Sequence, residues 1–285
     1  MLDKKKAVQV ARVPRENSNA KNLHGESKQT AQQDSLAESR NRILNAKSPF
    51  SVTEAYKTAR TNLLFLRTEE SCQTIAVTST FESEGKTTNC VNLSITLAQA
   101  GLRTLLVDAD FRRPMLDRIF GMRSVEGLSD YLACLTKEKT PEEALNLIKP
   151  TEFERLSLFP AGHIPPNPAE LLSSKRMEQL FTVLSARYDY IMIDTPPASV
   201  VTDATVLKNL INGYLIVVRA GQTPQDGLTE CIMRMKQIDA SILGILLNDV
   251  DAKSSYQKYS YKYRKYGHYY KYGDYAEEHS DNNQQ

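Results

Sequence analysis

A lysine flanked by a glycine and a threonine follows a short apolar run near residue 78, in a pattern that suits phosphate binding. Residues 78–88 read TSTFESEGKTT and open into a segment of helical character. In such a loop the backbone N–H groups and the helix N-terminus attract phosphates, a lysine reaches the β- and γ-oxygens, and a hydroxyl binds Mg²⁺. Gly85, Lys86 and Thr87 match the second half of this pattern, whereas Thr80 replaces its first glycine. An exposed Gly-Lys-Thr at a helix start is the simpler alternative.

Two further apolar runs end in carboxylates. Residues 105–114 read LLVDADFRRP and place Asp108 and Asp110 two positions apart, so that in an extended chain both project to the same side. Residues 190–197 read YIMIDTPP and end a buried strand in Asp194, as the metal-side carboxylate of a phosphate-binding loop requires. Such groups suit an Mg²⁺-nucleotide site at the carboxyl ends of parallel strands. A helix-capping or turn role is the alternative for Asp108.

Tyrosines gather near the C-terminus, where residues 256–275 hold nine of the fourteen in the chain. They are spaced by Lys, Arg, Gly and Ser, whereas a packed segment would show apolar residues at a period of two or about 3.6. So many phenols need either a stacking partner or a chemical fate. Five basic residues against Asp274 leave this stretch with a charge near +4. The nine are Tyr256, Tyr259, Tyr261, Tyr263, Tyr266, Tyr269, Tyr270, Tyr272 and Tyr275.

The totals describe an ordinary globular protein. Of 285 residues, 41% are hydrophobic and 25% charged, and the net charge of +2 argues against bulk affinity for nucleic acid. The four cysteines show no metal-type or paired spacing, which indicates reduced thiols. No apolar run reaches the roughly 18 residues of a membrane helix, and the N-terminus does not resemble a signal peptide. We therefore expect a chain that neither spans a membrane nor is exported.

Short apolar runs alternate with helical segments between residues 49 and 251. Strands are expected over residues 74–78, 104–107, 156–159, 190–193, 214–218 and 242–247. Helices are expected over residues 87–100, 174–187 and 224–239. Several strands are apolar at successive positions, as strands covered on both faces are. The pattern predicts an α/β fold of the P-loop NTPase type, with a mostly parallel sheet flanked by helices on both faces.

Composition divides the chain into three regions. Residues 1–48 carry ten Lys/Arg against five Asp/Glu and are rich in Gln, Asn and Ser, which predicts a disordered basic arm with a short helix near residues 36–44 at most. Residues 49–251 are expected to form the P-loop domain. Residues 252–285 are expected to form a flexible tail that carries the tyrosine cluster.

Taken together, these motifs resemble those of a known family. The runs GKTT at 85–88, VDADFRRP at 107–114 and IDTPP at 193–197 resemble the Walker A, Walker A′ and Walker B motifs of bacterial tyrosine kinases. The segments GLSDYL at 127–132 and PAGHIPPNPAELL at 160–172 resemble blocks typical of that family rather than of its relatives in cell division and plasmid partitioning. The resemblance covers about residues 51–275.

The resemblance implies an autokinase of the capsule and exopolysaccharide assembly system. Such an enzyme uses ATP and Mg²⁺ to phosphorylate tyrosines in the C-terminal cluster of a neighbouring subunit. The expected ATP contacts are Ser83, Glu84, Gly85, Lys86, Thr87, Thr88 and Asn248. The last of these matches an adenine-contacting position in related ATPases, with a turn-capping role as its alternative. The expected metal site consists of Thr87, Asp110 and Asp194.

Four residues are expected to take part in phosphoryl transfer, which depends mainly on positioning and charge stabilisation. We expect Asp108 to receive the phenol proton, Asp110 to support the water shell of the metal, and Lys86 to hold the phosphates. Arg112 is expected either to steady phosphate charge or to form an ion pair with Asp110.

Residues 54–60 read EAYKTAR and match the E-x-x-R-x-x-R ring-forming motif of the family, with Lys57 in the first Arg position. On a helix Glu54, Lys57 and Arg60 share a face, although Lys lacks the bidentate fork of Arg. A solvated charged face is the alternative. The implied partners are further copies in a ring, a separate transmembrane activator of the polysaccharide co-polymerase type, and a phosphotyrosine phosphatase. The expected location is the cytoplasm, at the inner face of the plasma membrane.

Three other functions fit part of the sequence. A partitioning ATPase would release phosphate to water, but such relatives carry a second lysine early in the loop, where Phe81 stands here. A nucleic-acid binder would use Tyr and Lys of the tail as a stacking platform, yet it leaves the nucleotide motifs unexplained. A catalytically silent adaptor of the polysaccharide machinery is compatible with the loop in which Thr80 replaces glycine.

Overall fold

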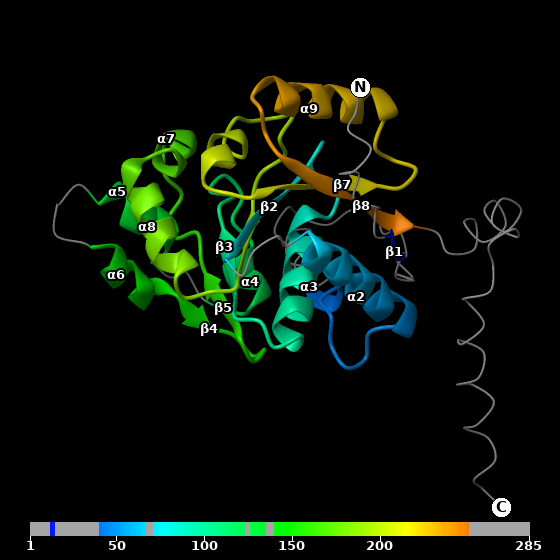
Figure 1. Cartoon of the computed structure of the whole chain (residues 1–285), viewed down its shortest axis with the longest axis horizontal. Coiled ribbons are helices and arrows are strands. Elements are labelled where there is room, and N and C mark those ends of the chain that lie inside the picture. Colours follow the sequence, from blue (N-terminus) through cyan, green and yellow to red (C-terminus); the bar gives the residue numbers. More distant parts are fainter. Residues whose placement is uncertain (1–11, 15–39, 67–70, 123–125, 135–139, 251–285) are drawn as a thin grey trace, which may run out of the picture. The chain divides into compact units, whose positions relative to one another are not determined.

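The computed structural model describes residues 12–14, 40–66, 71–122, 126–134 and 140–250. An eight-stranded sheet runs through them in the order β1-β8-β7-β2-β6-β3-β5-β4 (Figure 1). All neighbouring strands pair in parallel except β4 and β5. The six expected strands are confirmed as β2 (Gln73–Ser79), β3 (Thr104–Asp108), β5 (Leu156–Phe159), β6 (Tyr190–Asp194), β7 (Gly213–Arg219) and β8 (Ile242–Val250).

Helices cover both faces of the sheet, as expected. The three predicted helices are confirmed as α3 (Lys86–Gln99), α8 (Lys175–Ser185) and α9 (Gln225–Gln237). The long helix α2 (Phe50–Phe65) carries the expected ring motif and packs against α3. The shorter elements are β4 (Lys149–Pro150), α4 (Leu116–Ile119), α5 (Leu128–Ala133), α6 (Pro141–Ala144), α7 (Pro168–Leu172) and the 3₁₀ helices Leu145–Leu147 and Thr205–Asn209.

Alternation along the central strands creates a separate core on each face of the sheet. Ile75 and Val77 of β2 pack into one core with the buried side chains of α2 and α3, whereas Ala76 between them packs into the other. That second core receives the buried faces of α8 and α9. Because both faces are covered, the strands are apolar at successive positions rather than at alternate ones.

The region expected to be a disordered arm contributes to the sheet, which corrects that expectation for its described residues. β1 (Arg12–Pro14) pairs in parallel with β8, and its Val13 is buried. Leu44 is also buried and donates its backbone N–H to the side chain of Asn92 in α3. The helix expected near residues 36–44 lies partly outside the described residues, and Leu44 itself is not helical. Residues 12–14 and 40–48 are therefore part of the domain.

The two segments that resemble family-specific blocks pack against each other beside β5. Leu128 and Ser129 donate backbone N–H groups to the carbonyl oxygens of Pro160 and Ala161 at 2.9 and 2.8 Å. Gly127 lies so close to this second segment that a Cβ on it would stand 2.2 Å from the oxygen of Pro160. The blocks therefore fix a loop junction in the fold.

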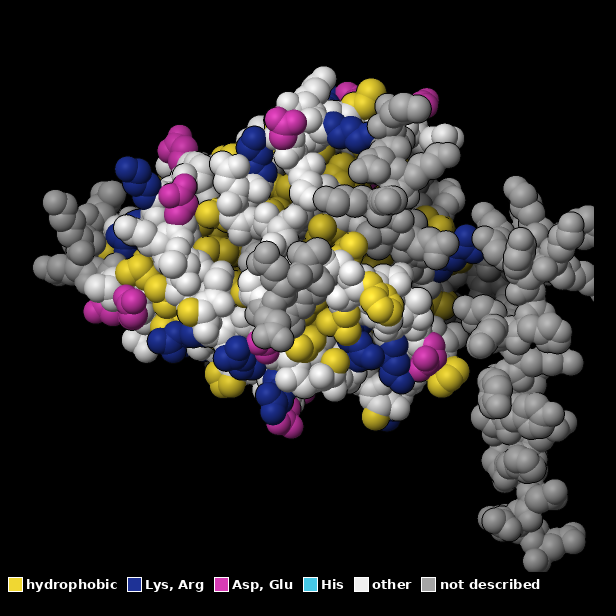
Figure 2. Space-filling model, viewed as in Figure 1, with side chains coloured by type: hydrophobic (Ala, Val, Ile, Leu, Met, Phe, Trp, Pro, Cys, Tyr) yellow, Lys and Arg dark blue, Asp and Glu magenta, His cyan; other side chains and the backbone are white. Residues whose placement is uncertain are grey.

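The surface of the domain is mixed in character. Basic and acidic side chains are interspersed with small hydrophobic patches on the face shown in Figure 2. None of the described helices has the length and apolar character needed to cross a bilayer. The described residues end with β8, and the tyrosine cluster lies wholly outside them.

Candidate nucleotide site

The phosphate-binding loop connects the buried strand β2 to the first residue of α3. Gly85 is the residue before the helix and has φ of 91°, a left-handed conformation that side chains disfavour. A Cβ at this position would also stand 2.2 Å from Nδ2 of Asn248, whose amide donates to the carbonyl oxygen of Glu84 at 3.0 Å. Ser83 adopts φ of 62°. Glycine is therefore required at residue 85 both by its conformation and by its neighbour.

Glu84 holds the part of the loop in which the first glycine of the motif is missing. Its carboxylate accepts the backbone N–H groups of Thr80 at 2.8 Å and Phe81 at 3.0 Å. It also accepts the hydroxyl of Thr223 from the turn after β7. The side chain is only 5% exposed. The carboxylate of Glu84 thus lies in the base of the loop. The expected contact of this residue with ATP stays a prediction.

Lys86, Thr87, Asp110 and Asp194 form one cluster, as the sequence predicted. The ammonium of Lys86 donates to Oδ2 of Asp110 at 2.8 Å and lies 4.0 Å from Oδ1 of Asp194. The hydroxyl of Thr87 donates to Oδ2 of Asp194 at 2.7 Å. Three elements supply these groups, since Lys86 and Thr87 begin α3, Asp194 ends β6, and Asp110 follows β3. The cluster sits where parallel strands end, the usual ligand-binding edge of such sheets.

Burial and mutual charge shift the proton affinities in this cluster. Burial lowers the pKa of Lys86, but the carboxylates of Asp194 and Asp110 outweigh it and raise that pKa above its ordinary value. Burial raises the pKa of Asp194 to about 6, with Lys86 acting in the opposite direction. Lys86 is therefore a permanent cation at neutral pH, and its charge holds two acids in place.

The cluster fits an Mg²⁺ ion that takes some of its ligands from the protein and the others from a nucleotide. Asp194 Oδ1 is buried and has no hydrogen-bond partner, while Oδ2 of the same carboxylate binds the hydroxyl of Thr87. Among the described ranges, no group of three or more His, Cys, Asp or Glu side chains is arranged to hold a metal. Mg²⁺ often takes only one or two carboxylates and completes its shell with phosphate and water. The Thr87–Asp194 pair suits that kind of site.

Asp108 occupies a turn position rather than an open face of the site. The residue is fully buried, and its Oδ1 accepts the backbone N–H of Asp110 at 3.2 Å. Its Oδ2 accepts the N–H groups of Met115 at 3.2 Å and Leu116 at 3.1 Å. Burial and the negative charge of Asp194 raise the pKa of Asp108 well above its ordinary value. The turn role left open by the sequence is therefore present in the structure.

Arg112 forms an ion pair with Asp203, so the expected alternative of a pair with Asp110 is wrong. Its Nε and Nη2 donate to the two carboxylate oxygens of Asp203 at 2.6 and 3.0 Å. The carboxylate is fully buried, whereas the arginine side chain is about half exposed. The guanidinium neutralises a buried charge that lies in a loop 91 residues further along the chain.

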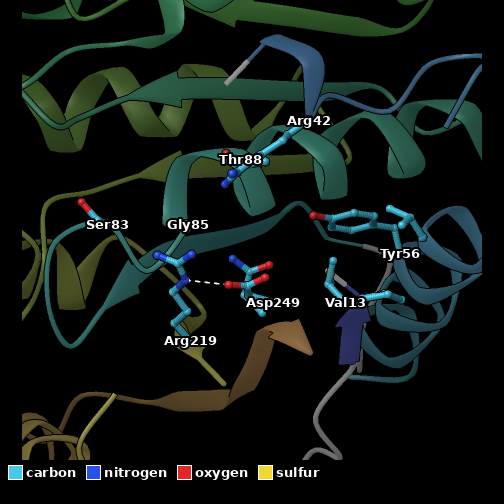
Figure 3. Close-up of a pocket in the computed structure, with 11 residues that line it drawn as sticks. Val13, Arg42, Tyr56, Ser83, Gly85, Thr88, Arg219 and Asp249 are labelled. Carbon is cyan, nitrogen blue, oxygen red and sulfur yellow. Dashed lines mark hydrogen bonds and ion pairs between the residues drawn. The ribbon is translucent and has the colours of Figure 1, made fainter. Parts of the chain in front are cut away.

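A pocket adjoins the other side of the phosphate-binding loop (Figure 3). Asn248 lines it, as expected for a residue near the base of a nucleotide. Ser83, Gly85 and Thr88 form the side that belongs to the loop. The ends of β7 and β8 add Arg219 and Asp249, which form an ion pair at 2.8 Å. Val13, Pro14, Arg42, Val52 and Tyr56 complete the lining.

The sequence analysis did not identify the residues that the N-terminal part contributes to this pocket. Val13 lies in a three-residue strand within a polar segment, so no apolar period marks it. Tyr56 offered a weak signal, because it is an aromatic residue within a charged helical motif. Its hydroxyl donates to Oδ1 of Asn89 at 2.9 Å, and Nδ2 of Asn89 donates to the carbonyl oxygen of Gly85 at 2.9 Å.

The three residues of the expected ring motif do not act alike in the structure. Lys57 pairs with Glu54 at 2.7 Å on the exposed side of α2. Arg60 instead turns toward α3, where it donates to the carbonyl oxygen of Thr96 at 3.0 Å. Glu54 and Lys57 are thus presented outward, while Arg60 links two helices of one chain.

Comparisons with known proteins agree with this geometry. Residues 72–247 match the AAA_31 family, described as an AAA domain. The tyrosine-protein kinase YwqD of Bacillus subtilis (strain 168) is 34% identical over 209 residues, covering 73% of this chain and 85% of the relative. The tyrosine-protein kinase wzc of Salmonella typhi is also 34% identical over 209 residues, but these make up only 28% of that protein.

The solved kinase domain of the Escherichia coli tyrosine kinase ETK has the same architecture. It is 27% identical, with a TM-score of 0.71, and the match covers 86% of this chain and 92% of that one. The resemblance inferred from the Walker-type motifs is thus confirmed by sequence and by fold. The chain belongs to the family of bacterial tyrosine-protein kinases built on an AAA domain.

Proposed function

We propose that this chain is an ATP-dependent autokinase that phosphorylates the tyrosine cluster of a neighbouring copy. The observation that carries the proposal is the buried cluster in which Lys86 meets Asp110 and Asp194 while Thr87 binds Asp194. A cation for the phosphates and a hydroxyl–carboxylate pair for Mg²⁺ are the two parts that phosphoryl transfer needs. The tail supplies nine phenols directly after this domain.

Each residue of the cluster has a separate role in this reaction. Lys86 leaves its contact with Asp110 and binds the β- and γ-phosphates, and the loop amides that end at α3 bind further phosphate oxygens. Thr87 and Asp194 hold Mg²⁺, and Asp110 orients its water. An Mg²⁺ ion held by these residues would neutralise charge on the phosphates. The base of the nucleotide lies beside Asn248.

We assign the phenol proton to Asp108. The tyrosine oxygen forms a bond to the γ-phosphorus, the bond to the β–γ bridging oxygen breaks, ADP leaves, and the phenol proton passes to a carboxylate. Asp108 must be ionised to take this proton, whereas burial and the negative charge of Asp194 raise its pKa, so the role requires the positive charges of Lys86 and of bound Mg²⁺ to favour the carboxylate. The carboxylate is fully buried, so the turn between Asp110 and Met115 must open for the phenol to enter. Asp108→Asn should abolish labelling while ADP binding persists, and unchanged labelling would refute the assignment.

Mixing two full-length variants tests both the reaction and its direction. One variant carries Lys86→Met and keeps all its tyrosines, and the other keeps Lys86 but has Phe at the nine tail positions. With ATP and Mg²⁺, phosphotyrosine mapped by mass spectrometry should appear on the Lys86→Met chain only in the mixture. Phosphate release without phosphotyrosine would instead support the partitioning-type ATPase, and neither product would support a silent adaptor.

The positive charge of residues 256–275 explains how phosphorylation can stop further reaction. Each phosphate adds about −1.5 to −2 charges, so two or three reverse the charge near +4. A cationic tail is attracted to the acidic cluster, and a phosphorylated one is repelled. We expect the phosphorylated protein to dissociate from its ring. Equal sedimentation of the phosphorylated and dephosphorylated proteins would contradict this.

The assembly and its partners follow from the family. Glu54 and Lys57 are exposed on α2 and offer one charged face for a neighbouring copy. In wzc the matching region is 28% of a much longer protein. For this chain we propose a separate transmembrane activator at the inner face of the plasma membrane. A phosphotyrosine phosphatase would reset the tail. The process served is the polymerisation and export of capsular polysaccharide or exopolysaccharide.

A further inference from the structure

We propose that the N-terminal strand β1, together with Arg42, forms a wall of the nucleotide site and sets its affinity for the nucleoside half of the ligand. This rests on the proposed function in one respect, namely that the pocket beside the phosphate-binding loop holds a nucleotide. Both parts lie outside residues 72–247, the region that matches the AAA family. The wall is therefore not part of the region that the family model describes.

The position of β1 places it against the pocket. It pairs in parallel with β8, with Arg12 opposite Leu247 and Pro14 opposite Val250. Asn248 and Asp249 lie on this part of β8, and both line the same pocket as Val13 and Pro14. β1 is the edge strand of the sheet in the part of the chain that the structure describes, and a proline is tolerated at such an edge.

Burial shows that this contact is a packed one. Val13 is 4% exposed, although it belongs to a strand of only three residues. Figure 3 shows Val13 and Tyr56 on one side of the pocket and the phosphate-binding loop on the other. An apolar side chain and an aromatic ring facing polar groups are the usual lining of a site that takes a purine base.

Arg42 is tied to the domain by its backbone and presents its side chain to the pocket. Nδ2 of Asn92 donates to the carbonyl oxygen of Arg42 at 2.9 Å, and Oδ1 of the same amide accepts the N–H of Leu44 at 2.9 Å. Asn92 is buried in α3, so the segment is held firmly. In Figure 3 the guanidinium of Arg42 lies beside Thr88.

Two arginines line the pocket at different places. Arg219 forms a mostly buried ion pair with Asp249 at the strand ends, whereas Arg42 lies on the side of Thr88. A cation next to Thr88 would stabilise the innermost phosphate of a nucleotide, whereas Lys86 serves the outer ones. The wall thus combines two features. Its apolar surface suits the base, and the charge of Arg42 suits the innermost phosphate.

Binding of two ligands to full-length variants tests the proposal. Affinities for ADP and for tripolyphosphate, each with Mg²⁺, are measured by calorimetry on the wild type, Val13→Asp and Val13→Ile. We expect Val13→Asp to weaken ADP binding about tenfold, which is about 1.4 kcal/mol, and to leave tripolyphosphate binding unchanged. Val13→Ile should bind both ligands as the wild type does. Met233→Asp, on the exposed side of α9, is the matched control.

The outcomes separate this proposal from the proposed function. Wild-type binding of ADP by a Val13→Asp protein with native melting behaviour would overturn the wall. Equal weakening of ADP and tripolyphosphate would also overturn it, since the strand would then act on the whole loop. If Val13→Asp does not fold, Val13→Ala takes its place with the same criteria. A wild type that binds ADP but forms no phosphotyrosine would refute the kinase reaction alone.

Discussion

The two sides of the phosphate-binding loop are built in different ways. On the phosphate side, Lys86 and Thr87 begin α3, Asp194 ends β6 and Asp110 follows β3. Lys86 contacts Asp110, and Thr87 contacts Asp194. On the base side, the lining comes from the N-terminal segment, the loop and the ends of β7 and β8, and includes apolar and aromatic groups. The first side is ionic and deeply buried, and the second is a mixed surface.

The difference indicates that the two sides of the loop have separate functions, one in phosphoryl transfer and the other in nucleotide affinity. Groups that act on the transferred phosphate must be placed within hydrogen-bond distance, so they come from short motifs at rigid strand ends. Groups that hold the base need only shape and burial, so distant segments can supply them. Changes on the phosphate side should therefore abolish chemistry, whereas changes on the base side should mainly weaken affinity.

The largest effect is expected for Lys86→Met. The loss of a charge that stabilises the transition state should reduce phosphotyrosine formation by about a hundredfold to a thousandfold. Labelling with ATP and Mg²⁺ measures it, with the exposed Lys175→Met as control. Retention of more than about a tenth of the activity would show that the ion pairs of Lys86 serve only the fold.

A second change tests the electrostatics of the same side. In Mg²⁺-free buffer, Asp194→Asn should stabilise the fold relative to the parent, and more so at about pH 7.5 than at about pH 4. Burial raises the pKa of Asp194 from 3.8 to about 6, so the folded parent favours the protonated form and loses stability as pH rises through about 6. The shift corresponds to about 3 kcal/mol.

Urea unfolding at each pH measures this difference. Asp226→Asn, on the exposed start of α9, is the control and should show a much smaller change. A stability difference between Asp194→Asn and the parent that does not grow with pH would mean that Lys86 fully compensates the buried charge.

Glu84→Ala lies between the two sides and should affect both. It removes the acceptor of the N–H groups of Thr80 and Phe81, and leaving such groups unpaired costs about 2 kcal/mol. Glu82→Ala is the matched control, because its ion pair with Arg113 is exposed and contributes less than about 0.5 kcal/mol. Urea unfolding compares the two, and equal effects would show that the loop does not depend on Glu84.

The smallest effect is expected on the base side, for Asn248→Ala. ADP should bind about fivefold to tenfold more weakly, or about 1 kcal/mol, while tripolyphosphate binding stays constant. The amide also supports the carbonyl oxygen of Glu84, so calorimetry is paired with a melting curve. Asn209→Ala, at the exposed end of the 3₁₀ helix, is the control. A fall in tripolyphosphate affinity would show that Asn248 acts on phosphate binding rather than on the base.

The phosphate side could be predicted from the sequence because its residues lie in contiguous runs. The apolar runs before Asp110 and Asp194 indicate that each acid lies at the carboxyl end of a strand. Parallel strands bring these ends to the same edge of the sheet. The same logic located six strands and three helices. Burial of both sheet faces produces the continuous apolar runs that made these elements visible.

Contacts between distant segments could not be read in the same way. The carboxylate of Glu84 is directed by Thr223, which lies 139 residues later. Arg112 was assigned to a phosphate or to Asp110, because nothing in the sequence marks Asp203 as a buried acid. The composition around β1 predicts a disordered arm, since three residues in a polar segment show no period. Their order comes from pairing with the edge of β8.

Hydrogen exchange with and without ADP and Mg²⁺ tests most directly whether both sides form one nucleotide site. We expect slower exchange in peptides from the loop before α3 and also in peptides that contain Arg12 and Val13 or the end of β8. Helix α9, which does not line the pocket, should change little beyond its first turn. Protection confined to the loop, with β1 and β8 exchanging as in the free protein, would show that the base side does not bind the nucleotide.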